Sequence, residues 1–269
     1  MTPNLEGKTA IVTGGTMGIG LATAVALARC GADCTVTYKW GTADAGAVHE
    51  SFARVGARQP LIVEADVADD SALECLLDQA RKRWDRIDIL ISNVSCALLV
   101  NSLEDYCLRS LNKSIEYTAW PLFGYTKRIR ERFGKYPRYV IGMSSPGPDS
   151  YNTGYDFAAM SKAVLETMCR YMSYRLFQED IRINIVRSVA VRTESWRRTY
   201  ADFERFANQF VRESHYIEAE EISNVVVALC SGYLDGMRGQ VITADRGISQ
   251  FDNLVGLYSE RDRFGQEGA

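Results

Sequence analysis

A serine, two tyrosines and a lysine lie within one short stretch of the sequence, residues 144–162, which reads SSPGPDSYNTGYDFAAMSK. Tyr155 and Lys162 are seven residues apart, so on a helix they would point in nearly the same direction, roughly 10 Å apart along the axis. A lysine ammonium near a phenol favours the phenolate, which makes the tyrosine a better proton donor to a substrate oxyanion. The spacing predicts a proton-transfer site in which Ser144 and Tyr151 supply further hydroxyl groups, although a core tyrosine and a solvated lysine would have the same spacing.

The segments around this stretch predict the elements that position it. An apolar strand over 138–143 delivers Ser144, and a helix over 155–179 carries the lysine. Strands and helices alternate in this way along most of the chain, which predicts an α/β fold: a single-domain, Rossmann-type, doubly wound parallel sheet of about seven strands with helices on both faces. The other expected strands are 9–13, 34–38, 61–64, 87–91, 181–186 and 240–244, and the other expected helices are 21–30, 43–55, 71–84, 103–133 and 219–231.

The first strand ends in a glycine-rich turn, TGGTMGIG, and the next helix follows directly. Glycines at such a turn keep it tight, let backbone N–H groups approach a pyrophosphate, and let the helix pack closely on the strand. The strand before the turn and the helix after it favour nucleotide binding over a plain structural turn. We assign Gly14, Thr16, Gly18, Ile19 and Gly20 to this site.

The ends of the second and third strands carry the residues expected to meet the adenosine half of the nucleotide. The second strand ends in Tyr-Lys-Trp, without the carboxylate that would bind a free ribose 2′-hydroxyl, and Lys39 could instead meet a 2′-phosphate. This favours NADPH as the cofactor, with NADH possible. Asp66 lies just past the third strand, where it could accept from the adenine amino group, and Val67 follows it.

Further polar residues are expected at the same carboxyl edge of the sheet, where this architecture binds its ligand. Asn93 follows the fourth strand, and Ser188 lies at the end of the sixth. Asn112 lies on the long 103–133 helix, which should break near Pro121, and we expect it to be buried among apolar neighbours and to need a partner. The aromatic and arginine-rich segment 192–216 predicts either a mobile substrate lid or an amphipathic surface helix.

Composition limits the classes of function. The 269 residues lack an internal linker, so we expect one domain over 1–250 and a polar tail over 251–269. The chain has 31 Lys plus Arg and 34 Asp plus Glu, with the basic residues scattered, which argues against a nucleic-acid groove. No metal site is expected.

The cysteines and the hydropathy pattern predict a cytoplasmic protein. The seven cysteines form no CxxC pair and most have apolar neighbours, which is typical of reduced thiols. The amino-terminal segment has no basic region followed by an apolar run, and no segment is long and apolar enough to cross a membrane.

These motifs together resemble the short-chain dehydrogenase/reductase family over roughly residues 5–250. The resemblance implies a nicotinamide cofactor, with Thr193 at the cofactor and Asn112 positioning the lysine through water. In most of this family the catalytic tyrosine precedes the lysine by four residues, and here that residue is Ala158. Tyr155 restores a phenol at Tyr-x6-Lys, which resembles the enoyl-acyl-carrier-protein reductase branch. The matching features are TGGTMGIG, Asp66-Val67, Asn93, Asn112, Ser144, Ser161-Lys162, Asn184, Thr193 and Gly239-Gln240-Val241 with Asp245 and Gly247.

That branch implies a reaction. NADPH would deliver a hydride to the β-carbon of an enoyl thioester, and Tyr155 would donate to the thioester oxygen as the enolate forms. Lys162 would hold the nicotinamide ribose, Ser144 would orient the substrate or the tyrosine, and Tyr151 is a candidate second phenol. Arg187 stands where this family commonly has a small residue, which points to a specialised rather than a housekeeping substrate.

Two other functions remain open at this point. One is a carbonyl or imine reductase that uses Tyr155 or Tyr151 in a shifted geometry. The other is a catalytically silent NADP-binding sensor subunit, which Ala158 would explain. The expected partners are an acyl thioester, possibly on an acyl carrier protein, and further copies of the chain in a homodimer or homotetramer, because the 155–179 helix has apolar residues on more than one face.

Overall fold

A parallel seven-stranded sheet forms the centre of the protein, as predicted. The computed structural model describes residues 3–39, 44–96, 98–189, 191–193, 216–250 and 258. The strand order is β3-β2-β1-β4-β5-β6-β7, and every neighbouring pair is parallel. The strands are β1 (Thr9–Val12), β2 (Asp33–Tyr38), β3 (Leu61–Glu64), β4 (Ile89–Ser92), β5 (Tyr139–Ser144), β6 (Arg182–Ser188) and β7 (Val241–Ala244).

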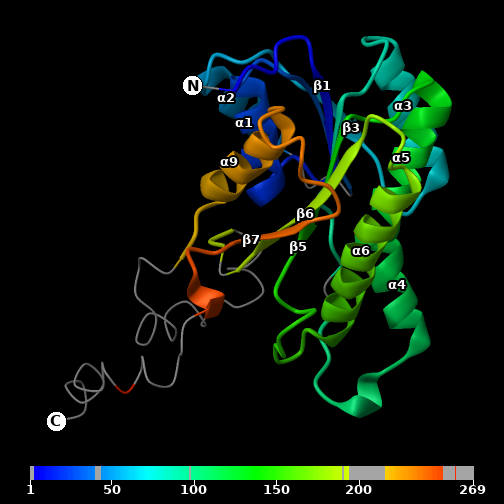
Figure 1. Cartoon of the computed structure of the whole chain (residues 1–269), viewed down its shortest axis with the longest axis vertical. Helices are drawn as coiled ribbons and strands as arrows, with labels where there is room; N and C mark the ends of the chain where they lie inside the picture. The colour runs from blue at the N-terminus through cyan, green and yellow to red at the C-terminus, as the bar shows by residue number, and fades with distance from the viewer. Residues whose placement is uncertain are drawn as a thin grey trace.

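Helices cover both faces of the sheet and create two hydrophobic cores (Figure 1). One core lies beneath α1, α2 and α9, and the other lies beneath α3, α5 and α6, with α4 packed against α6. The helices are α1 (Gly18–Arg29), α2 (Ala45–Arg54), α3 (Asp70–Arg81), α4 (Leu108–Thr118), α5 (Trp120–Phe133), α6 (Asp156–Arg175) and α9 (Ala219–Cys230), and the short 3-10 helices are η1 (Leu103–Asp105) and η3 (Ile248–Gln250).

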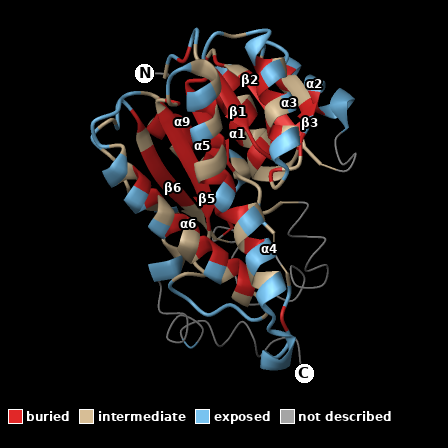
Figure 2. Cartoon of the chain, turned by 90° about the vertical axis from the view of Figure 1, so that its right-hand side faces the viewer, coloured by how far each residue is buried: buried red, intermediate tan, exposed pale blue. Residues whose placement is uncertain are grey.

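Burial on both faces explains the continuous apolar runs of the central strands. Every residue of β1, β4 and β5 is buried, and Figure 2 shows β1 and β5 as buried ribbon behind partly exposed helices. A parallel sheet covered on both sides needs such runs rather than an apolar–polar alternation. Because these strands are parallel, the polar side chains at their carboxyl ends lie together at one edge of the sheet.

The helices that flank the predicted site differ in detail from the sequence prediction. The 103–133 helix is divided into η1, α4 and α5, and Ala119 caps both α4 and α5, two residues before Pro121. This confirms the predicted break. Helix α6 begins at Asp156, and Tyr155 is its N-cap residue with φ −100° and ψ 12°. Tyr155 therefore lies just outside the helix that carries Lys162.

The predicted lid and tail fall mostly outside the described residues. At the two ends of the predicted lid segment, the Arg192 guanidinium lies 4.2 Å from the centre of the Tyr216 ring, and Val191 pairs with Ile217 in a parallel bridge. These contacts bring residues 191–193 and 216–217 together. Over the described ranges, none of the helices has the length and apolar character required to span a membrane.

Candidate active site

The glycine turn between β1 and α1 is held to the end of β4 by Asn93. The Asn93 side-chain amide donates to the carbonyl oxygens of Thr13 and Gly14, at 3.0 and 3.2 Å. A Cβ atom on Gly20 would lie 2.2 Å from the Gly14 oxygen and 2.7 Å from the Asn93 Nδ2 atom. Only glycine therefore fits at residue 20, and the predicted close packing of turn, strand and helix is present.

The start of α1 has the features of a phosphate site. Met17 is its N-cap and makes no side-chain cap, and the first turn has no acidic residue. Uncapped N–H groups at a helix start suit an anion. Gly18 has φ +53°, and a Cβ atom there would lie 3.6 Å from a Thr193 side-chain carbon, so Thr193 lies against the turn. A pyrophosphate therefore fits this turn, with the predicted cofactor residue Thr193 beside it; Thr16 is buried and Ile19 packs on the adjacent core.

Lys39 and Asp66, predicted separately to meet the 2′-phosphate and the adenine, contact each other. They form an ion pair, and the Lys39 Nζ atom also donates to the Tyr117 hydroxyl at 2.7 Å. Tyr117, on α4, donates in turn to Asp66 at 3.1 Å. Burial opposes ionisation of Asp66, but the hydrogen bond from Lys39 lowers the pKa of this carboxyl. This cluster lies just past the ends of β2 and β3, and Val67, the residue after Asp66, is buried.

The side chains of Ser144 and Lys162 are directed to partners that the sequence did not predict. Lys162 is 4% exposed, and its Nζ atom donates to the Met143 carbonyl oxygen at 2.7 Å. Burial lowers the pKa of Lys162 to about 8, against the opposing charge of Glu166. The Ser144 hydroxyl donates to Glu166 Oε1 at 2.7 Å. A free Ser144 hydroxyl at the substrate is therefore not what the structure shows.

Glu166 is also paired with Arg187 on β6. Arg187 Nε lies 2.6 Å from Oε1 and Nη2 lies 2.5 Å from Oε2, which is a bidentate pair. The third guanidinium nitrogen, Nη1, donates to Asp149 in the loop after β5. The hydrogen bonds to Glu166 raise the pKa of Arg187, and the hydrogen bond from Arg187 lowers that of Asp149.

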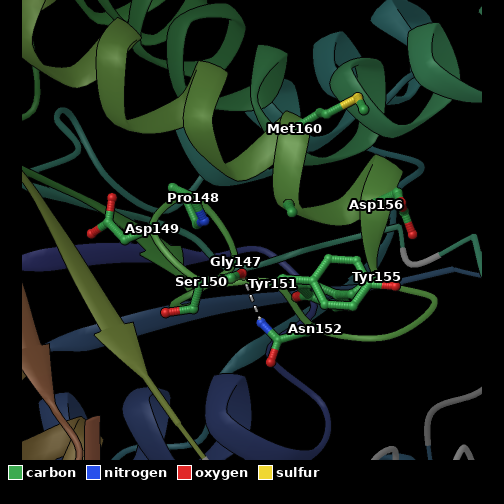
Figure 3. Close-up of a pocket in the computed structure, with 10 residues that line it drawn as sticks. Gly147, Pro148, Asp149, Ser150, Tyr151, Asn152, Tyr155, Asp156 and Met160 are labelled. Atoms are coloured by element: carbon green, nitrogen blue, oxygen red, sulfur yellow. Dashed lines mark hydrogen bonds between the residues drawn. The ribbon is translucent and has the colours of Figure 1, made fainter. Parts of the chain in front are cut away.

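Tyr155 and Tyr151 line one pocket of about 320 Å³, formed by the loop after β5 and the first turns of α6 (Figure 3). A Cβ atom on Gly147 would lie 3.1 Å from a Tyr155 ring carbon, so the ring packs directly on the loop backbone. Tyr155 is half-buried, whereas Tyr151 is 82% exposed. The predicted pair of phenols is therefore at one site. Ala158, at the alternative tyrosine position, is fully buried.

Asn112 does not have the predicted environment. The expectation that it is buried among apolar neighbours is wrong, because its side chain is exposed on α4. The buried polar residues of this helix are Ser114 and Thr118, four residues apart and so on one face. Thr118 Oγ1 accepts from the Cys96 N–H at 3.1 Å and so fixes the loop after β4.

Four residues at this edge were not predicted as site residues: Ser145, Tyr117, Glu166 and Arg187. Ser145 follows Ser144, and its hydroxyl is buried without a hydrogen-bond partner among the described residues, so an unsatisfied hydroxyl lies directly after β5. The serine pair in the sequence was the available signal for Ser145. Glu166, four residues after Lys162, was a weaker signal, and Arg187 was visible only as an unusual residue.

The chain belongs to the short-chain dehydrogenase/reductase family of oxidoreductases, and its parallel sheet and the glycine turn after β1 agree with this assignment. Residues 14–249 match the family model described as enoyl-(acyl carrier protein) reductase.

Individual relatives differ in what they act on. The chain is 29% identical to the short-chain dehydrogenase/reductase FrzI of Cladobotryum sp, over 91% of this chain and 97% of that protein. It is 25% identical to the NADH-dependent enoyl-acyl-carrier-protein reductase FabI of Buchnera aphidicola, over 72% and 75%. The fold is similar to that of L-sorbose reductase from Gluconobacter frateurii, solved with NADPH and L-sorbose: the TM-score is 0.82 at 19% identity, covering 93% and 100%.

Proposed function

We propose that the protein is an NADPH-dependent reductase of an activated carbon–carbon double bond, with an enoyl thioester on an acyl carrier protein or coenzyme A as substrate. The observation that carries this proposal is the place of the phenols. Position 158 is a buried alanine, and Tyr155 and Tyr151 lie together at the pocket. The match of residues 14–249 to the enoyl reductase family model supports the same reading.

The residues divide into a cofactor side and a substrate side. The α1 N-terminus and Thr193 would hold the pyrophosphate, and Lys39 would meet the 2′-phosphate in exchange for Asp66. The bound cofactor supplies the hydride. On the substrate side, Tyr155 donates to the thioester oxygen, where negative charge develops in the transition state, and Ser145 supplies a second hydroxyl. Lys162, protonated below about pH 8, places a buried positive charge at the Met143 carbonyl oxygen, near the end of β5.

The proposal is tested by NADPH oxidation with crotonyl-CoA, with acetoacetyl-CoA, and with neither. We expect oxidation with the enoyl thioester. Tyr155→Phe should lower kcat by about two to four orders of magnitude, as for loss of a proton donor, while the Kd for NADPH stays nearly constant. Tyr151→Phe is the matched control, with a smaller loss. Turnover of the ketone alone would show a carbonyl reductase, and NADPH binding without any turnover would favour the sensor reading.

We also propose that the protein is a cytoplasmic homodimer or homotetramer. All seven cysteines are free, which suits a reducing compartment. Tyr171 and Tyr174 on α6 are 69% and 82% exposed, and Tyr171 lines an apolar depression together with Val164 and Met168. Light scattering at micromolar concentration should give at least a dimer. Tyr171→Lys should weaken the assembly, whereas Tyr233→Lys, at an equally exposed tyrosine after α9, should not; a monomeric wild-type protein would contradict the proposal.

A further inference from the structure

A continuous chain of polar contacts runs from the end of β5 to the loop that forms the pocket. It begins at the Ser144 hydroxyl, passes through the Glu166 carboxylate on α6 and the Arg187 guanidinium on β6, and ends at Asp149. Glu166 Oε1 accepts from both Ser144 and Arg187, and Oε2 accepts from Arg187. Both carboxylate oxygens and three guanidinium nitrogens are therefore used.

The middle of this chain is buried. The Glu166 side chain is 4% exposed and that of Arg187 is 12% exposed. Moving such charges out of water is costly, and a buried ion pair adds little net stability compared with apolar residues of similar size. A role in fixing one arrangement of the site explains the buried ion pair better than stability does. The residues at the two ends of this series of polar contacts indicate which arrangement is fixed.

This series of contacts links the surroundings of Lys162, through Glu166, to the wall of the pocket, through Asp149. Lys162 and Glu166 are four residues apart on the buried face of α6. Asp149 lines the pocket that contains Tyr155, and with Arg187 and Glu166 it also lines a second cavity of about 380 Å³. The segment around Pro148 and Asp149 thus separates the two cavities. Within it, the backbone N–H groups of Asp149 and Ser150 both donate to the Pro146 carbonyl oxygen.

We propose that Glu166 and Arg187 are positioning residues, which hold the Pro146–Ser150 turn in the wall of the Tyr155 pocket and set the charge environment of Lys162. Arg187 fixes the turn through Asp149. Glu166 supplies the negative charge that acts on Lys162, and Arg187 balances that charge. The functional meaning of the pocket rests on the proposed reductase activity, but both physical couplings can be measured without turnover.

The first experiment measures amide hydrogen exchange in the Pro146–Ser150 turn. Asp149→Asn removes the outer ion pair at an exposed position and should raise exchange of the Asp149 and Ser150 amides about 3- to 30-fold. Arg187→Lys should also raise this exchange, because one ammonium group cannot make the bidentate pair with Glu166 and contact Asp149 as well. Glu50→Gln, which removes an exposed partner of Arg54 on α2, is the matched control and should leave these amides unchanged. Unchanged exchange in Asp149→Asn would overturn the turn-fixing role.

The second experiment titrates Lys162 by NMR in protein with ¹³C,¹⁵N-labelled lysine, with the signal assigned from Lys162→Met. The titratable or charged side chains that are buried or half-buried on the described elements packed against α6 include Tyr117 on α4, Tyr125 on α5, Tyr139 on β5, and Arg182 and Arg187 on β6. The charge that acts on the pKa of Lys162 is that of Glu166 on α6 itself.

The two halves of the ion pair should shift this titration in opposite directions. Glu166→Gln removes the negative charge and should lower the pKa of Lys162 below that of the wild-type protein. Arg187→Met leaves Glu166 without its balancing cation and should raise it. Packing damage alone would not give opposite signs, and if one variant fails to fold, the other still decides. A titration that either folded variant leaves unchanged would overturn the role at Lys162. A protein that reduces no thioester but shows both shifts would refute the proposed reaction and keep this inference.

Discussion

The carboxylate of Glu166 and the guanidinium of Arg187 form a bidentate ion pair, at 2.6 and 2.5 Å, between α6 and β6. Both side chains are nearly inaccessible to water. In such a place the attraction between the charges is strong, but each charge alone would be costly, so the pair behaves as a unit. This property separates it from the many exposed ion pairs of the protein and leads to the first prediction.

Arg187→Met should lower the free energy of unfolding by about 3–5 kcal/mol, because it leaves a buried carboxylate without its cation. The double variant Glu166→Met, Arg187→Met should recover most of this loss, since neither charge of the pair then remains buried. Urea denaturation of the two single variants and the double variant measures the coupling. Arg54→Met, at an exposed pair on α2, should cost less than about 1 kcal/mol. Additive losses in the double variant would contradict the prediction.

Lys39 should determine the choice between the two nicotinamide cofactors. It already has an anionic partner in Asp66, so a 2′-phosphate would replace one charge-assisted contact by another. Lys39→Met should raise the Kd for NADPH about tenfold or more and change the Kd for NADH about twofold or less. Fluorescence titration with both cofactors measures this, and Lys127→Met on α5 is the control. An equal rise in the Kd for both cofactors would show that Lys39 maintains the structure of the adenosine site and does not select between the cofactors.

Thr118, and not Asn112, should matter for the loop after β4. Asn112→Ala removes an exposed side chain from α4 and should change the free energy of unfolding by less than about 0.5 kcal/mol. Thr118→Val keeps the shape but removes the acceptor for the Cys96 N–H, which should cost about 1–3 kcal/mol. Urea denaturation of both variants provides the comparison. A larger loss for Asn112→Ala would restore the sequence-based role of that residue.

This contrast shows what the sequence could and could not predict. The sheet, the glycine turn and Asn93 were accessible, because apolar periodicity and a local glycine pattern largely determine them. Asn112 was misplaced because α4 is amphipathic, and the sequence does not show which face packs on α6. The Lys162–Met143 contact and the Glu166–Arg187 pair join residues 19 and 21 positions apart. Such partners depend on how α6 lies across β5 and β6, which no local pattern specifies.

The buried amine of Lys162 should make stability depend on pH in an unusual direction. Burial lowers its pKa from 10.5 to about 8 in the folded protein, while the unfolded chain keeps the ordinary value. Between these two values the unfolded chain binds a proton that the folded protein has lost, so the free energy of unfolding rises with pH across this window. A shift of this size corresponds to an effect on the order of 3 kcal/mol, and the destabilisation by the buried charge is fully present below about pH 8.

The measurement compares urea denaturation of the wild-type protein and of Lys162→Met at several pH values between 7 and 10.5. Other titrating groups, such as the buried cysteines and tyrosines, contribute equally to both proteins and cancel in the difference. The free energy of unfolding of the variant minus that of the wild-type protein should be largest at pH 7. This difference should fall as the pH rises, because the wild-type lysine becomes neutral in the folded protein. Lys127→Met, at an exposed lysine, should give a curve parallel to that of the wild type. If the Lys162→Met curve is also parallel, Lys162 binds its proton equally in the folded and unfolded states, so its pKa keeps the ordinary value and burial does not lower it.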